Sequence, residues 1–263
     1  MNPSVLFVFI LSILLGVLRA ADLAFGTDAV TGLCVVGSVW WRYLALGIVV
    51  LAAVLVGRTQ PSRSEAVRSR RPLAGILAFV GAVCFLAAAG AQIALGAASG
   101  LGGFVRCILE CLCSAWLSTM GRSWLSPNEW KKPFGGLYLA MAGSLLFYWN
   151  VLLRFMENSS SWHRVSPTAQ VWVLLGMLVF LSSLVRALWL PETSDGKALC
   201  TSGLAAFVLG FCWELPQTLT LAMPSQFVLT ALPSIFFGLG MACLGTLGVF
   251  CTVRTAGPAA RKK

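Results

Sequence analysis

Two ionisable residues lie four positions apart in the apolar stretch FVRCILECLCSAW, residues 104–116. Arg106 and Glu110 are separated by about one helical turn, so the two side chains can pair on one face of a helix. A charge inside an apolar span is costly in lipid and often belongs to a binding site, an ion pathway or a proton relay. The stretch therefore contains either a structural ion pair or part of a functional site.

A second carboxylate, Glu214, lies in the apolar sequence FCWELPQTL, residues 211–219, with no basic residue within one turn of it. Its partner must come from another helix, from water or from a ligand. Pro216 follows closely, and a proline inside a helix removes a backbone hydrogen bond and loosens the preceding turn. Pro233 should do the same about two turns into the last apolar segment. We therefore predict helix kinks at Pro216 and Pro233.

Further polar residues fall at a similar depth when about 1.5 Å per residue is counted from the ends of the apolar segments. The sequence thus predicts a polar layer in the outer half of a helical bundle, with a tryptophan beside one of the carboxylates. The candidate binding or pathway residues are Glu214, Glu110, Arg106, Asn150, Arg154, Arg42, Gln92 and Trp213.

The residue types give little support to metal or catalytic chemistry. Cys107, Cys111 and Cys113 include one pair at helical spacing, but the single histidine, His163, lies in a different segment. We read the nine cysteines as small apolar helix residues, so we predict no metal, no cofactor and no disulfide framework. No zinc-protease or serine-hydrolase motif and no aspartate pair occurs. We assign no catalytic residue and do not expect an enzyme, although acid–base chemistry at Glu214 stays open.

The elements that would position these residues are transmembrane helices. Of the 263 residues, 58% are hydrophobic and only 11% are charged, whereas soluble domains carry roughly 25% charged residues. Apolar runs of about 20 residues, the length that crosses a bilayer, recur along the chain. We predict an all-α, polytopic transmembrane helical bundle without a soluble domain, so that residues 1–263 form one integral membrane domain. The predicted spans are 4–20, 38–57, 73–97, 104–121, 136–156, 168–190, 199–222 and 227–253.

Small residues favour close helix packing within this bundle. The third predicted span has a row at four-residue spacing, and the last span contains several glycines. The row consists of Ala74, Ala78, Ala82, Gly90, Ala94 and Ala98, interrupted only by Leu86.

Orientation follows from the 19 lysines and arginines, most of which collect on one side of the predicted topology. Such residues accumulate in cytoplasmic loops. We therefore predict a multi-pass protein of the plasma (inner) membrane with the N-terminus and the C-terminus cytoplasmic. Loops 58–72 and 122–135 would lie inside and loop 157–167 outside. Segment 4–20 could alternatively be a cleaved signal peptide, but its uncharged start favours a retained span.

The net charge of +10 agrees with basic cytoplasmic loops, and no nucleic-acid-binding pattern accompanies it. The expected partners are the lipid bilayer and a membrane or cytoplasmic protein that binds loop 58–72. The polar layer is either a structural network that fixes helix packing or a binding site. We expect a transport-like protein, either a small-molecule permease or a membrane subunit of a transport assembly. The alternative is a non-catalytic membrane sensor or interaction protein that uses the basic loop.

Overall fold

The computed structural model describes residues 3–28, 32–60, 67–98, 100–126, 130–156, 164–190, 196–223 and 227–255. Within these residues, eight helical segments are long and apolar enough to cross a membrane, and no strand is present. The predicted all-helical polytopic bundle is therefore confirmed. The eight segments are Pro3–Gly26, Val39–Thr59, Pro72–Ala94, Leu101–Leu125, Gly136–Met156, Val165–Trp189, Gly196–Leu221 and Leu229–Thr252.

Five of these segments are single α-helices, whereas the first, seventh and eighth combine helices of different type. The single helices are α2 (Val39–Thr59), α3 (Pro72–Ala94), α4 (Leu101–Leu125), α5 (Gly136–Met156) and α6 (Val165–Trp189). The first segment joins α1 (Pro3–Ala21) to the π-helix η1 (Asp22–Gly26). The seventh comprises α7 (Gly196–Ala206), the π-helix η3 (Phe207–Glu214) and α8 (Leu215–Leu221). The eighth comprises the 3₁₀ turn η4 (Leu229–Ala231) and α9 (Leu232–Thr255).

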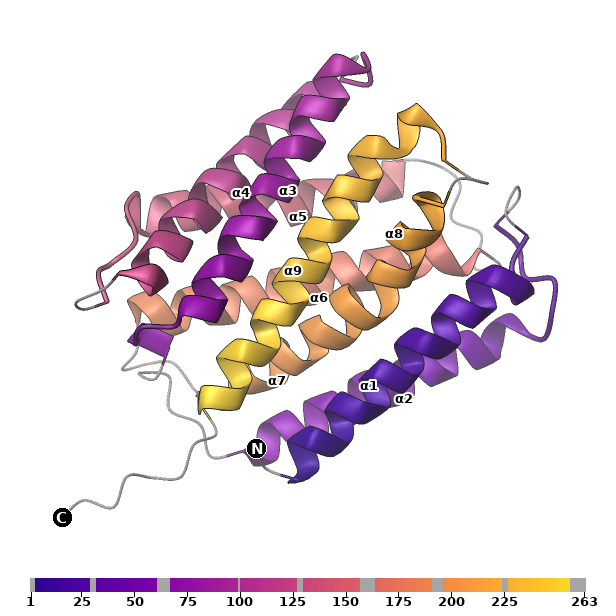
Figure 1. Ribbon diagram of the computed structural model, residues 1–263, viewed down its shortest axis with the longest axis horizontal. Helices are drawn as coiled ribbons and strands as arrows, with labels where there is room; N and C mark the ends of the chain where they lie inside the picture. Colours follow the sequence, from indigo (N-terminus) through magenta and orange to yellow (C-terminus); the bar gives the residue numbers. More distant parts are fainter. Residues whose placement is uncertain are drawn as a thin grey trace.

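The last two spans form the centre of the bundle. Figure 1 shows α9 running between α3 and α7, with α4 and α5 beyond α3 and the α1–α2 pair on the opposite flank. The seventh and eighth spans are the most buried, whereas the first two are the least buried and expose most of their surface. Glu214 therefore lies on a central span, while α1 and α2 present their outer faces to lipid.

Glycines allow the two central spans to approach closely. A Cβ added at Gly248 on α9 would lie 2.5 Å from the carbonyl oxygen of Gly203 on α7, and one added at Gly203 would lie 2.7 Å from that of Gly248. The small-residue row on α3 behaves differently. Its first members, such as Ala74, are buried, but Gly90 and Ala94 are exposed. Steps of four residues rotate by about 40° around a helix of 3.6 residues per turn, so the row leaves the interface.

The described part of the basic loop, 67–71, packs on the ends of other helices. The Arg68 guanidinium donates to the carbonyl of Leu188 at 2.6 and 3.1 Å, and Arg71 Nη1 donates to the carbonyl of Phe250 at 3.1 Å. The last four carbonyls of a helix lack partners within it, and Leu188 is in the last turn of α6, so Arg68 stabilises that helix end. Residues 61–66 of the predicted loop 58–72, and 157–163 of loop 157–167 with His163, lie outside the described residues.

The start of α1 and the end of α9 lie at the same end of the bundle (Figure 1). The ends of α2, α4 and α6 and the starts of α3, α5 and α7 also lie at this end. We call it the basic end, because it contains Arg68 and Arg71. Which side of a membrane it faces stays a prediction from the distribution of charge.

Candidate functional site

A polar cavity of about 130 Å³ lies within the bundle, between α4, α5, α6, the η3–α8 segment and α9. Side chains from five of the eight spans converge on it, and most of them are polar. The lining residues are Arg106, Asn150, Leu153, Arg154, Gln170, Leu174, Glu214, Gln217, Thr218, Leu221, Ser234 and Phe237.

The structure brings half of the eight predicted site residues to this cavity: Arg106, Asn150, Arg154 and Glu214. Glu110 and Gln92 lie just outside the lining and are joined to it through Arg106. Arg42 and Trp213 line a different surface, beside α1. Four further lining residues were not predicted from the sequence, and all four are uncharged: Gln170, Gln217, Thr218 and Ser234.

Glu110 has a complete set of partners. Its side chain is fully buried, and Arg106 Nε donates to Oε1 at 3.0 Å from one turn earlier on α4. Gln92 on α3 donates from Nε2 to both carboxylate oxygens, at 2.8 and 2.9 Å. The Arg106 guanidinium also lies 5.1 Å from the ring centre of Phe237 on α9, a cation–π distance. Glu110 is therefore part of a cross-linked structural group.

Glu214 is buried with far fewer partners. Its side chain is 5% exposed, and Gln170 Nε2 lies 3.4 Å from Oε1. Glu214 Oε2 has no hydrogen-bond partner among the described residues, and neither has the side-chain oxygen of Gln217. The charges of Arg154 and Arg19 act on Glu214. Because buried polar atoms are normally hydrogen-bonded, two unpartnered acceptors call for donors from water or from a ligand.

The cavity has room for such donors. One water occupies about 30 Å³ of liquid, so 130 Å³ corresponds to about four waters or to a molecule of a few heavy atoms. Asn150 donates from Nδ2 to the Leu146 carbonyl at 2.8 Å, which fixes its amide against its own helix. Two carboxylates, Glu110 and Glu214, stand near two guanidinium groups, Arg106 and Arg154. The formal charges in and beside the cavity therefore balance.

The backbone that carries Glu214 is irregular. The π-helix η3 (Phe207–Glu214) ends directly before α8, in which Pro216 is the second residue. Pro216 has no N–H, so it cannot donate to the Cys212 carbonyl one turn earlier. Single π-helical turns are rare in proteins and are frequent at functional sites. The irregular segment coincides with the predicted weak point at Pro216.

Pro233 lies closer to the start of its helix than the sequence predicted. We expected the last helix to begin near residue 227, which would put Pro233 about two turns into it. Instead, α9 begins at Leu232, after the short turn Leu229–Ala231. Pro233 is therefore in the first turn of α9, where backbone N–H groups have no partner within the helix and a proline breaks no hydrogen bond.

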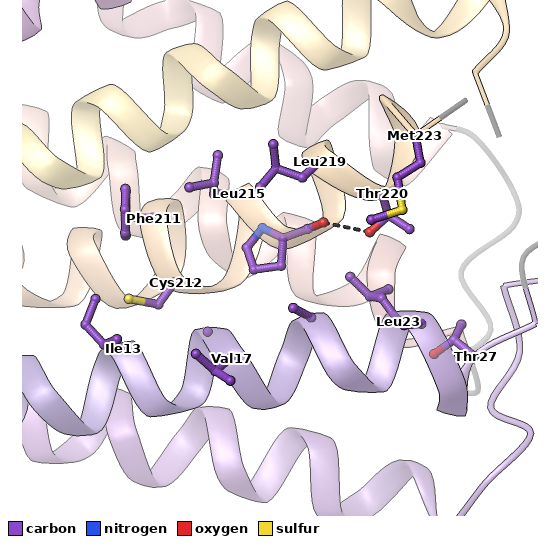
Figure 2. A pocket seen from close by; sticks show the side chains of 14 residues that line it. Ile13, Val17, Leu23, Thr27, Phe211, Cys212, Leu215, Leu219, Thr220 and Met223 are labelled. Atoms are coloured by element: carbon purple, nitrogen blue, oxygen red, sulfur yellow. Dashed lines mark hydrogen bonds between the residues drawn. The ribbon is translucent and has the colours of Figure 1, made fainter. Parts of the chain in front are cut away.

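An apolar cavity of about 460 Å³ lies on the opposite face of the η3–α8 segment, against α1 (Figure 2). Ile13 and Val17 on α1 face Cys212 and Leu215 across it. Glu214 and Gln217 point to the polar cavity on the other side. The irregular helix segment therefore separates the polar cavity from an apolar cavity that opens at the surface, where Val17 and Leu219 are exposed.

Arg42 lies outside the polar cavity and pairs with Asp22. Its Nε lies 2.9 Å from both carboxylate oxygens of Asp22, whose Oδ2 also accepts from Arg19 Nη1 at 2.7 Å. The predicted first span ended at residue 20 and so excluded Asp22, which lies in the π-helix η1 directly after α1. The spacing of Arg19 and Asp22, three residues apart, was a signal for this pair. The Arg19 guanidinium lies 4.5 Å from the ring centre of Trp213. Trp213, which was also predicted to join the polar layer, therefore contacts the Arg19–Asp22–Arg42 group instead.

The fold and these polar groups define a multi-pass α-helical membrane protein with a polar cavity inside the bundle. The chain matches no protein-family model, no curated protein and no solved structure. In the part of the chain that the structure describes, no three His, Cys, Asp or Glu side chains come together as metal ligands would.

Proposed function

We propose that this chain is a transport-like membrane protein whose polar cavity binds a small polar solute or ion on its way across the bilayer. The observation that carries the proposal is Glu214, a buried carboxylate with an unpartnered oxygen in a cavity lined by five spans. Ionisable residues inside membrane spans often mark substrate and ion pathways. The proposal includes a location in the plasma (inner) membrane with both termini cytoplasmic, on the basis of the charge distribution.

The cavity chemistry supports a solute that carries hydrogen-bond donors. The Gln217 oxygen is an acceptor, and so is Glu214 Oε2 when the carboxylate is ionised. An amine, an ammonium group or bound water can donate to both. Arg106 and Arg154 add donors on the same cavity. A small molecule with both a donor and an anionic group, together with water, would match this lining.

The irregular backbone supports movement at the cavity. Transporter sites are typically formed by discontinuous helices, because unwound turns both bind solute and allow rearrangement. Here a π-helix and Pro216 lie beside Glu214, and the 460 Å³ apolar cavity leaves space behind the same segment.

The arrangement differs from that of a purely structural network, in which every buried polar group would have a partner. Glu110 fits that description, but Glu214 does not. The sensor alternative rests on loop 58–72 as a binding surface for a partner. Arg68 and Arg71 from that loop hydrogen-bond to helix carbonyls, which leaves fewer of its charges for a partner.

Solvent access to the cavity tests the proposal. We would introduce Ser234→Cys and Gln170→Cys separately and add a membrane-impermeant methanethiosulfonate to cells or sealed vesicles. Labelling is measured as the increase over the wild-type chain, which already contains nine cysteines. Ser182→Cys is the matched control, because Ser182 is exposed on the lipid-facing surface of α6. A pathway predicts that both cavity cysteines react and that Cys at position 182 does not. Folded variants that react from neither side of the membrane would overturn the proposal.

A further inference from the structure

A second recess lies beside α1, on the lipid-facing flank of the bundle. This recess, which we call the Arg19 groove, has a volume of about 250 Å³ and shares no lining residue with the polar cavity. Its charged part contains Arg19, Asp22 and Arg42, and its apolar part includes Leu15 and Leu18 from α1. The groove therefore combines a charged end with an apolar wall.

The charged end has an excess of positive charge and two donors without partners. The other donors are largely used, since Arg42 also donates to backbone carbonyls and Arg19 Nη2 donates to Ser166. Asp22 pairs with both arginines, so the three side chains carry a net charge of +1. Arg19 is only 3% exposed, and its Nε has no hydrogen-bond partner among the described residues. Trp213, 2% exposed, also lines the groove, and its Nε1 has no such partner either. Unpartnered donors beside a net positive charge match an oxyanion, which accepts charge-assisted hydrogen bonds.

The position of the groove indicates a ligand from the membrane. Arg19 lies seven residues before the end of the first span, roughly 10 Å below it, and Arg42 lies near the start of α2. Both are at the end of the bundle opposite the basic end. Leu18 is 57% exposed and Trp41 is 72% exposed, so the groove opens between the two spans that contact lipid most. An occupant that enters here brings an apolar chain as well as a charge.

We propose that the Arg19 groove binds one anionic phospholipid. Its phosphate oxygens would accept from Arg19 Nε and Trp213 Nε1, Arg42 would add its positive charge, and an acyl chain would lie against Leu15 and Leu18. Arg19 Nε and Trp213 Nε1 are covered in the structure. The phosphate would therefore reach them through a shift of the Arg19 side chain over the indole ring. A soluble anion would use the same donors but would leave the apolar wall without an occupant.

The indole nitrogen gives a conservative test. We would reconstitute the protein in phosphatidylcholine nanodiscs, add increasing fractions of phosphatidylglycerol, and measure the half-saturating fraction from the rise in thermal stability. Trp213→Phe keeps an aromatic ring beneath Arg19 but removes one donor to an anion, so we expect the half-saturating fraction to rise by about tenfold. Trp116→Phe is the control, because Trp116 is also fully buried with an unpartnered Nε1 but lies on α4. Its half-saturating fraction should equal that of the wild type.

A second pair of variants separates this site from general attraction to a basic protein. Arg42→Gln removes a charge from the groove, whereas Arg122→Gln removes an exposed charge at the basic end. The stability of each variant is compared between the two lipids, so a general loss of stability cancels. If Trp213→Phe does not fold, the Arg42→Gln and Arg122→Gln pair alone tests the proposal. Only Arg42→Gln should weaken the phosphatidylglycerol response. Equal responses within both pairs, or equal stabilisation of the wild type by both lipids, would overturn the proposal. An equal effect of inorganic phosphate in phosphatidylcholine discs would overturn the assignment to lipid.

Discussion

The side-chain amide of Gln92 donates to both carboxylate oxygens of Glu110, and this contact joins α3 to α4 inside the bundle. Arg106 completes the group with a bond of 3.0 Å to the same carboxylate. Glu214 has no comparable set of partners, although it is almost as deeply buried. The two carboxylates should therefore respond differently to substitution, Glu110 through stability and Glu214 through function.

Replacing Glu110 should destabilise the protein. Glu110→Ala leaves Arg106 and Gln92 without their shared acceptor, and breaking a buried ion pair in this way costs about 3 kcal/mol. Glu110→Gln should cost less, because the amide keeps the shape and one acceptor oxygen. The measurement is the midpoint of thermal unfolding in detergent. Cys111→Ala, at the adjacent exposed position of α4, is the control and should unfold like the wild type. A Glu110→Ala protein as stable as this control would show that the group does not stabilise the fold.

Glu214→Gln should preserve abundance and thermal stability within about 1 kcal/mol, because the amide has nearly the same shape and Oε2 has no partner to lose. It should nevertheless fail to restore the phenotype of a strain from which the protein is deleted. Glu214→Ala should fail in the same assay and also lose stability, because it opens a gap beside Trp213. If Glu214→Gln fully restores the phenotype, the functional site lies elsewhere. If Glu214→Gln unfolds as readily as Glu214→Ala, the charge of Glu214 has a structural role.

The contact between the two central helices gives a test of the fold itself. Gly248→Ala should destabilise the protein by roughly 1–3 kcal/mol, because the new methyl group meets the Gly203 backbone rather than a side chain that can move. Gly47→Ala on α2 is the matched control, since an added Cβ there meets no atom within 4 Å. Thermal unfolding of the two variants should differ clearly. Equal midpoints would mean that α7 and α9 do not approach as closely as the structure has them.

The transmembrane architecture could be predicted from the sequence because it depends on a simple property, the length of apolar runs between charged or turn-forming segments. The length of apolar runs did not predict where individual helices begin and end. Asp22 looked like the start of a loop, yet the first span continues to Gly26 as a π-helix. Pro233 looked like an interruption, yet it lies at the start of α9. Local hydrogen bonding and neighbouring helices determine such ends, and hydropathy does not report them.

The candidate site could be predicted in part for a related reason. Arg106 and Glu110 were paired correctly because both lie on one helix, where the spacing alone brings them together. Contacts between helices depend on rotation about each helix axis, which depth along the span does not give. Arg42 therefore joined the predicted layer by depth but pairs with Asp22. Gln170 and Gln217 were missed because an uncharged polar residue near the end of a span is common and gives no signal of its own.

The remaining prediction concerns the orientation of the whole bundle, and two exposed positions test it. Phe134 lies in the segment between α4 and α5, at the basic end, and Ser38 precedes α2 at the opposite end. Because basic residues favour the cytoplasm, Phe134→Cys should be labelled by an impermeant maleimide only after the membrane is opened. Ser38→Cys should be labelled in intact cells, and the wild type gives the baseline from Cys34, which also lies between η1 and α2. The reverse pattern would invert the topology, so that the basic end and both termini face outward and the Arg19 groove opens to the cytoplasmic leaflet.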